Sequence, residues 1–140
     1  MKYWLVKSEP FKYSWNDMLK DKVTYWDGVR NFQARNYLKM MEKKDQVLFY
    51  HSNEGKEIVG ITEVVKEYYQ DPTTKDKKWV VVDLKAKKSL KRKISLSEIK
   101  EDSTLSKMGL IKQSRLSVME IKKTHFEKII RKSNERSIVW

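Results

Sequence analysis

The chain has 140 residues, and a length of about 100 to 200 residues is typical of a single domain. It contains 31 Lys and Arg against 19 Asp and Glu, and the resulting net charge of +12 attracts polyanions. Five Trp, seven Tyr and four Phe favour a packed core over disorder, and the absence of Cys excludes a disulfide framework, a thiolate nucleophile and a Cys-based zinc site.

The chain begins with a predicted strand that is followed by a short helix. The apolar run 3–6 predicts a buried strand, which ends at the turn Ser8-Glu9-Pro10. Ser14 and Asp17 have the spacing of a capping pair, in which side chains bond the free N–H groups at a helix start. We therefore expect a short helix that ends at about Lys20.

An amphipathic helix follows a predicted turn at Asp27-Gly28. From Asn31 onward, apolar residues recur at the i, i+3, i+4 and i+7 positions of one helix face, and these are Ala34, Tyr37, Leu38 and Met41. The apolar run 47–51 then predicts a further strand.

The second half of the chain predicts longer strands. Residues 58–69 read as one long strand that is bent at Gly60, because a glycine inside a strand often marks a bulge. Residues 78–84 predict a buried strand, and we expect 85–94 to continue as an exposed, basic strand or hairpin. Residues 117–119 predict one more short strand.

Two segments fit the capping box, 95–98 and 124–127. They predict a short helix near Ser97 and a C-terminal helix whose inward residues are Phe126, Ile129 and Ile130. The five or six predicted strands do not alternate regularly with the three or four short helices, which argues against a doubly wound sheet. We predict an α+β fold in one domain, 1–140, with a small, mostly antiparallel, barrel-like sheet flanked by helices.

The positive charge is concentrated in the second part of the chain, with a net charge of +3 in residues 1–60 and +9 in residues 61–140. The densest run is 85–93, and the second is 122–136. Either run can bind a polyanion without sequence specificity. The alternative is that its side chains are simply solvated at the surface.

Residues that enzymes use for catalysis are sparse. The four glycines are isolated, so no glycine-rich phosphate loop can be drawn. His51 and His125 are the only histidines, and two histidines without cysteine argue against a transition-metal site. The carboxylates Glu101 and Asp102 lie among lysines, a poor setting for an acid–base pair. We therefore predict no catalytic residues, no metal and no cofactor.

The segment 25–31 carries residues suited to a nucleotide. Trp26 offers a flat face on which a base can stack, and Asn31 can bond a base edge. Arg30 and Arg35 can hold phosphate oxygens near the start of a helix. The alternative is that Asn31 caps the helix and Trp26 belongs to the core.

Three further polar clusters are predicted to stand where strands end: 7–9, 50–53 and 115–117. Strand ends at one mouth of a small barrel can converge on one pocket, and we expect this convergence here. For His51, a hydrogen-bonded position at a strand end is the alternative to a binding role. Trp4, Trp15 and Trp79 are predicted to be core residues.

These residues carry a family likeness. Five segments resemble the EVE domain: Tyr3-Trp4-Leu5-Val6-Lys7-Ser8-Glu9-Pro10, Trp26-Asp27-Gly28-Val29-Arg30-Asn31-Phe32-Gln33-Ala34-Arg35-Asn36, Val47-Leu48-Phe49-Tyr50-His51-Ser52-Asn53, Ile58-Val59-Gly60-Ile61 and Arg115-Leu116-Ser117-Val118. The resemblance runs in order along essentially the whole chain. It implies a PUA-like pseudo-barrel with flanking helices, related to the YTH readers of methylated adenine.

The resemblance also implies a function. It points to a non-catalytic reader that holds a modified base of DNA or RNA, a cytosine or an adenine, in a pocket at one end of the barrel. By motif position it implies a pocket role for Lys7, Ser8, Trp26, Val29, Arg30, Asn31, Tyr50, His51, Ser52, Arg115, Leu116 and Ser117. The Lys-rich stretch 85–93 departs from many relatives.

Two other functions remain open at this point, an RNA-binding protein without modification specificity and a nucleic-acid-processing enzyme.

Residues 1–10 contain no apolar run of signal-peptide length, and no later stretch is long enough to span a membrane. We therefore expect a cytoplasmic protein, or a nuclear one in a eukaryote, that is monomeric and binds nucleic acid rather than a membrane.

Overall fold

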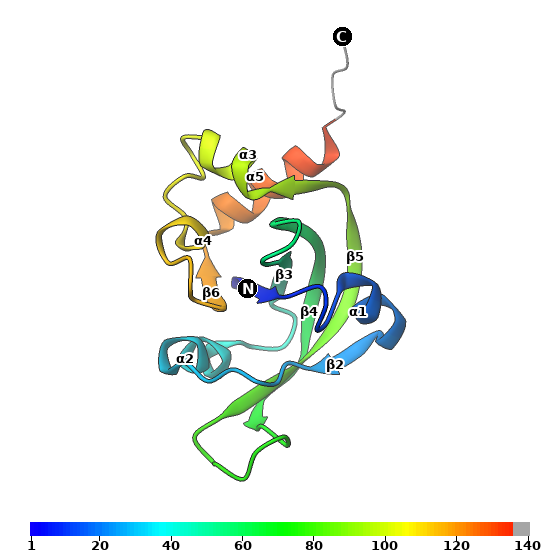
Figure 1. Cartoon of the computed structure of the whole chain (residues 1–140), viewed down its shortest axis with the longest axis vertical. Helices are drawn as coiled ribbons and strands as arrows, with labels where there is room; N and C mark the ends of the chain where they lie inside the picture. The colour runs from blue at the N-terminus through cyan, green and yellow to red at the C-terminus, as the bar shows by residue number, and fades with distance from the viewer. Residues whose placement is uncertain (136–140) are drawn as a thin grey trace.

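A computed structural model describes residues 1–135, which form six strands and five helices (Figure 1). The strands are β1 (Tyr3–Ser8), β2 (Val23–Tyr25), β3 (Gln46–His51), β4 (Glu57–Gln70), β5 (Val80–Ser95) and β6 (Val118–Ile121). The helices are α1 (Trp15–Asp21), α2 (Phe32–Met40), α3 (Leu96–Glu101), α4 (Gly109–Lys112) and α5 (Lys123–Asn134). The predicted basic tail ends at Arg136, which lies outside the described residues.

All six strands belong to one mixed sheet, in the order β2-β5-β4-β3-β1-β6. β1 runs parallel to β3 and the other neighbours are antiparallel, which confirms the predicted α+β fold with a mostly antiparallel sheet. Parallel neighbours need a long crossover, and the chain between β1 and β3 supplies it with α1, β2 and α2. Within residues 1–135 the edge strands β2 and β6 do not pair with each other, so the barrel-like sheet is open.

β4 and β5 are long and bent, and in Figure 1 β5 follows one whole side of the molecule. Their pairing changes register at four places, and such irregularities bend and twist a strand. Gly60 lies at the first of them, as its position inside the strand predicts. A Cβ atom at Gly60 would overlap the indole ring of Trp15, so glycine is what allows α1 to pack directly against the sheet.

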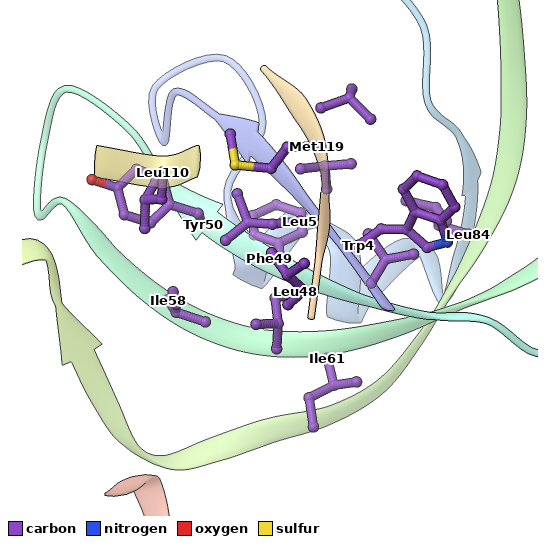
Figure 2. Packing of buried hydrophobic residues seen from close by; sticks show 14 of the residues in the cluster. Trp4, Leu5, Leu48, Phe49, Tyr50, Ile58, Ile61, Leu84, Leu110 and Met119 are labelled. Atoms are coloured by element: carbon purple, nitrogen blue, oxygen red, sulfur yellow. The ribbon is translucent and has the colours of Figure 1, made fainter. Parts of the chain in front are cut away.

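The central strands β1 and β3 are buried on both faces, and for this reason their apolar runs are continuous rather than alternating. Trp4 and Phe49 have no exposed surface, and Figure 2 shows them in the cluster of core side chains. Helix α1 packs Trp15 against Phe49 with ring centroids 5.2 Å apart, and α2 packs Tyr37 against Trp4 at 5.9 Å. The predicted core positions of Trp4 and Trp15 are confirmed.

Asp45 is a buried carboxylate at the beginning of β3. It accepts hydrogen bonds from the indole N–H of Trp4 (3.0 Å) and from the backbone N–H groups of Lys2 (3.1 Å) and Glu42 (3.0 Å). A buried carboxylate without partners would cost several kcal/mol, and these donors offset that cost. Asp45 thereby holds the start of β1 beside the start of β3.

Three predicted helix starts are confirmed. Ser14 and Asp17 form the predicted capping box at α1, and Ser95 accepts a hydrogen bond from the backbone N–H of Glu98 at α3. Asn31 caps α2 by accepting a hydrogen bond from the backbone N–H of Ala34. The alternative interpretation of Asn31, as a cap, is therefore correct.

The predicted cap at Thr124 is wrong. Helix α5 begins at Lys123, and its N-cap residue Lys122 makes no side-chain capping bond. The start of α5 follows from packing instead, because Phe126 lies against Tyr3 with ring centroids 4.4 Å apart. The inward positions of Phe126, Ile129 and Ile130 are confirmed, since Ile129 is fully buried and the other two pack on the core.

Candidate functional site

A pocket of about 670 Å³ opens where the end of β1, the end of β2 and the turn after β3 meet the segment that leads into β6. Its size falls within the usual range for small-ligand sites, roughly 300 to 1,000 Å³. The lining residues are Lys7, Ser8, Glu9, Lys12, Tyr13, Thr24, Tyr25, Trp26, Asp27, Gly28, Val29, Ser52, Asn53, Ser114, Arg115 and Ser117. The three polar clusters therefore converge on one pocket, but 115–117 precedes β6 and does not end a strand as predicted.

Lys7 and Ser8 end β1 at the pocket. The Nζ of Lys7 donates a hydrogen bond to the carbonyl oxygen of Ser114 (2.8 Å), and burial lowers the pKa of this amine. Its backbone N–H donates to the carbonyl oxygen of Ser117 (2.9 Å). The hydroxyl of Ser8 donates to the carbonyl oxygen of Tyr13 (2.6 Å), so both side chains are held in place by backbone groups.

Trp26 belongs both to the core and to the pocket lining. It is only 8% exposed, and its ring meets those of Phe49 (5.5 Å) and Tyr13 (6.2 Å) edge to face. Its backbone N–H donates to the carbonyl oxygen of Val82 (2.9 Å). The two interpretations of Trp26 are compatible, because an indole packed against two neighbouring rings is a rigid wall for a ligand.

Asp71 holds the turn that follows Trp26. Its side chain is fully buried and accepts hydrogen bonds from the backbone N–H of Gly28 (3.1 Å) and from Arg30 (3.0 Å). Gly28 has φ of 77°, a left-handed conformation that glycine adopts without strain. The pocket wall at 26–29 is thus tied to the loop between β4 and β5.

Five of the predicted site residues do not line the pocket. Arg30 turns to Asp71, and Asn31 uses its carbonyl oxygen as the α2 cap. Tyr50 and Leu116 are buried among core residues, and Figure 2 shows Tyr50 within that cluster. The Nε2 of His51 accepts a hydrogen bond from the backbone N–H of Trp15 (2.9 Å) at the start of α1, and burial and the charge of Lys93 lower its pKa.

Nine lining residues were absent from the predicted set: Glu9, Lys12, Tyr13, Thr24, Tyr25, Asp27, Gly28, Asn53 and Ser114. Glu9 and Asn53 belong to the polar clusters at strand ends, and the amide of Asn53 donates to Glu9 (2.8 Å), so these clusters signal them. Tyr13 and Thr24 come from the turn before α1 and from β2, for which the apolar pattern carries no signal.

Some of the basic side chains form ion pairs within the fold. Lys87 of β5 pairs with Glu63 (3.1 Å), and Arg92 makes two short bonds to Glu98 (2.7 and 2.8 Å). In α5, Lys128 and Lys132 lie 3.8 and 3.1 Å from Asp102. Other lysines of the 85–93 run, including Lys85, Lys88 and Lys91, are exposed.

Residues 1–135 contain neither a membrane-spanning helix nor a cluster of metal ligands. None of the described helices is long and apolar enough to cross a membrane. In the same part of the chain, no three His, Asp or Glu side chains are grouped so as to hold a metal ion.

The fold and the pocket define a class: an α+β protein with an open, curved sheet and a basic surface, and a pocket with an indole wall at the ends of its strands. The chain belongs to the EVE domain family, whose sequence profile matches residues 2–132. Chicken thymocyte nuclear protein 1 is 34% identical to it, over 96% of this chain and 69% of the relative.

Solved structures agree with this assignment. A protein of Agrobacterium tumefaciens superposes with a TM-score of 0.92 at 39% identity, over 96% of this chain and 94% of the other. Human THYN1 protein, solved in complex with DNA that contains 5-methylcytosine, superposes with a TM-score of 0.91 at 31% identity, over 98% of this chain and 100% of the other. The YTH domain of Zygosaccharomyces rouxii MRB1, solved with N6-methyladenosine RNA, shares the fold. It superposes with a TM-score of 0.60 at 13% identity, over 97% of this chain and 88% of the other.

Proposed function

We propose that this protein binds nucleic acid and holds one modified base in the pocket, without catalysing a reaction on it. The observation that carries the proposal is the pocket itself, which combines an aromatic wall with hydrogen-bonding groups on a basic surface. The family membership supports it, because a relative with 31% identity was solved with DNA that contains 5-methylcytosine. For a protein with such a partner we expect a cytoplasmic location, or a nuclear one in a eukaryote.

In this proposal the twelve predicted site residues divide into two groups. Seven line the pocket and contact the base or its sugar and phosphate: Lys7, Ser8, Trp26, Val29, Ser52, Arg115 and Ser117. The other five support the pocket from behind, as Arg30 does through Asp71 and His51 does through α1. Asp27 and Asn53 add an acceptor and an amide at the rim, where base edges are read.

The binding energy has separable parts. Phosphate contacts by lysine and arginine supply an affinity that depends on salt and not on sequence. Leaving the stack costs the base a few kcal/mol, and least where it is already unpaired. Stacking on Trp26 and hydrogen bonds from the rim offset that cost. One fully buried methyl group adds about 0.8 kcal/mol, so we expect a several-fold preference for a methylated base.

The test compares short single strands that differ in one central base. We expect tighter binding of a strand with 5-methylcytosine, or with N6-methyladenosine, than of its unmodified counterpart, and intact strands after incubation. Trp26→Ala should remove this preference and weaken binding about tenfold, since stacking is worth about 1–3 kcal/mol per base. Trp26→Phe keeps an aromatic wall and should retain part of the preference.

Trp15→Phe is the matched control, because Trp15 is a buried tryptophan of the same core that does not line the pocket. Circular dichroism establishes that each variant is folded. Equal affinity for every modified and unmodified pair, with no modified nucleoside enriched from cellular nucleic acid by mass spectrometry, would favour binding without modification specificity. Cleaved or altered strands would show an enzyme instead.

A further inference from the structure

A second aromatic surface lies beside the pocket, between the start of α2 and the loop from β4 to β5. Phe32 is 55% exposed and stacks on Trp79, with ring centroids 5.2 Å apart and an angle of 30° between the planes. The guanidinium of Arg35 lies 4.9 Å from the centre of the Phe32 ring, and that of Arg30 lies 5.7 Å from the Trp79 ring. We call these four side chains the aromatic platform. Trp79 is thus a half-buried platform residue and not the core residue predicted from its strand.

The platform carries positive charge that the fold does not neutralise. Arg30 is paired with Asp71, whereas among residues 1–135 no carboxylate lies within ion-pair distance of Arg35. Within the described part of the chain, Arg35 bonds neutral acceptors, the side-chain oxygen of Asn36 (2.8 Å) and the carbonyl oxygen of Lys78 (3.4 Å). A planar guanidinium held over a ring is well suited to bind a phosphate.

The platform and the pocket are fixed relative to each other. Val29 lines the pocket and Phe32 follows three residues later, a stretch of chain that spans at most about 11 Å. Asp71 bonds both Gly28 in the pocket wall and Arg30 in the platform. A nucleotide that neighbours a base held in the pocket can therefore reach the platform.

We infer that the aromatic platform binds an unpaired nucleotide close to the one held in the pocket, and that single-stranded nucleic acid is therefore the preferred partner. A base stacks on the exposed part of Phe32, and Arg35 binds its phosphate. The inference rests on the proposed function, because the pocket must hold the neighbouring base. Bases of an intact duplex are covered on both faces by their neighbours, so they cannot use this platform.

The experiment compares Phe32→Ala and Arg35→Gln with a matched pair of controls. Lys39 and Tyr68 form the control, because the Nζ of Lys39 lies 5.4 Å from the ring of Tyr68 and this ring is 49% exposed. Tyr68→Ala and Lys39→Gln therefore remove the same kind of side chain near the other end of α2. The probes are a short single-stranded DNA with one central 5-methylcytosine, its unmodified counterpart, and the modified strand annealed into a duplex.

We expect Phe32→Ala and Arg35→Gln each to weaken binding of both single strands about fivefold or more, by the same factor for each strand. The preference for the modified strand stays unchanged, because the platform does not touch the modified base. Binding of the duplex changes less than about twofold, and the two control variants bind all probes like the wild type. Thermal unfolding establishes that the variants are folded.

Unchanged binding of the single strands by Phe32→Ala, or an equal loss in Tyr68→Ala, overturns the inference and leaves the pocket proposal standing. If the wild type shows no preference for the modified strand but Phe32→Ala still loses affinity, the pocket proposal fails and a strand-binding platform remains. A wild type that binds none of the probes overturns both, and the exposed rings then belong to a contact with another protein.

Discussion

The carboxylate of Asp71 determines where one wall of the pocket stands. It has no exposed surface and accepts hydrogen bonds from the backbone N–H groups of Gly28 (3.1 Å) and Thr73 (2.7 Å), from the Thr73 hydroxyl, and from Arg30 (3.0 Å). Burial alone would raise the pKa of Asp71, but these donors outweigh burial and lower the pKa to about 2. The residue was not singled out from the sequence, because one Asp before a Pro reads only as the end of a strand.

We expect Asp71→Ala to lower the free energy of unfolding by about 2–4 kcal/mol at pH 7, because it leaves buried donors without an acceptor. The folded pKa of about 2 lies below the ordinary value of 3.8, so the stabilisation is fully present above pH 3.8 and is lost as the pH falls through 2. Denaturant unfolding should show the gap between wild type and variant narrowing by about 2 kcal/mol over this window.

Asp76→Ala is the control for this experiment, because Asp76 lies in the same loop but is exposed. At neutral pH it should lower the free energy of unfolding far less than Asp71→Ala does, because water screens an exposed charge. If the difference in unfolding free energy between wild type and Asp71→Ala does not depend on pH, the charge of the carboxylate contributes nothing beyond its shape.

Pocket residues could be predicted from the sequence where they stand at the end of a strand, as Lys7, Ser8 and Ser52 do. They could not be predicted where a side chain is equally suited to a binding role and to a structural one. The amide of Asn31 and the imidazole of His51 suit a base as well as they suit a helix start, and only the fold shows that α2 and α1 take them. Proposing a pocket role by residue type alone does not separate these cases.

Helix α1 depends on a glycine in the strand beneath it. A Cβ at Gly60 would overlap the Trp15 ring, which neither the strand backbone nor the buried indole can easily avoid. We expect Gly60→Ala to lower the free energy of unfolding by about 1–3 kcal/mol, as overpacking of a core does, and to lower the melting temperature. Gly109→Ala is the control, because a Cβ there would meet only the sulfur of Met119 at 3.4 Å.

A double variant sharpens this test. If the overlap causes the loss, Trp15→Ala should cost less in the Gly60→Ala background than in the wild type, because the added methyl group then occupies emptied space. Additive losses in calorimetry would point to the strand backbone at Gly60 instead of its contact with Trp15.

Elements whose signal is local were the easier ones to predict. The caps Ser14 and Ser95 involve groups only three residues away, and both helices begin where these residues indicate. β2 went unpredicted because its three residues owe their conformation to pairing with β5, far along the chain. Thr124 failed as a cap for the same reason, since packing of Phe126 on Tyr3 places the start of α5.

The charge of +12 has more than one use across the molecule. Arg92 and Lys132 pair with carboxylates that join β5, α3 and α5, so this part of the charge stabilises the fold. Lys85, Lys88 and Lys91 are exposed, and among residues 1–135 they have no carboxylate within ion-pair distance. Lys85 pairs with Val23 of β2, and the other end of β2 is Tyr25 at the pocket. The run therefore begins two residues after Asp83, the residue of β5 that lies opposite Tyr25.

We expect the joint replacement of these three lysines by Gln to weaken binding of modified and unmodified single strands equally and to flatten the salt dependence. Each lost phosphate contact reduces the slope of log K against log salt by about 0.7 for a single strand, so three contacts reduce it by about 2. The matched control replaces Lys2, Lys43 and Lys44, which lie where the parallel strands β1 and β3 begin, opposite the strand ends at the pocket. If both triple variants change the slope of log K against log salt equally, the run acts only through long-range attraction. If neither variant changes the slope, the lysines of the run are simply solvated at the surface.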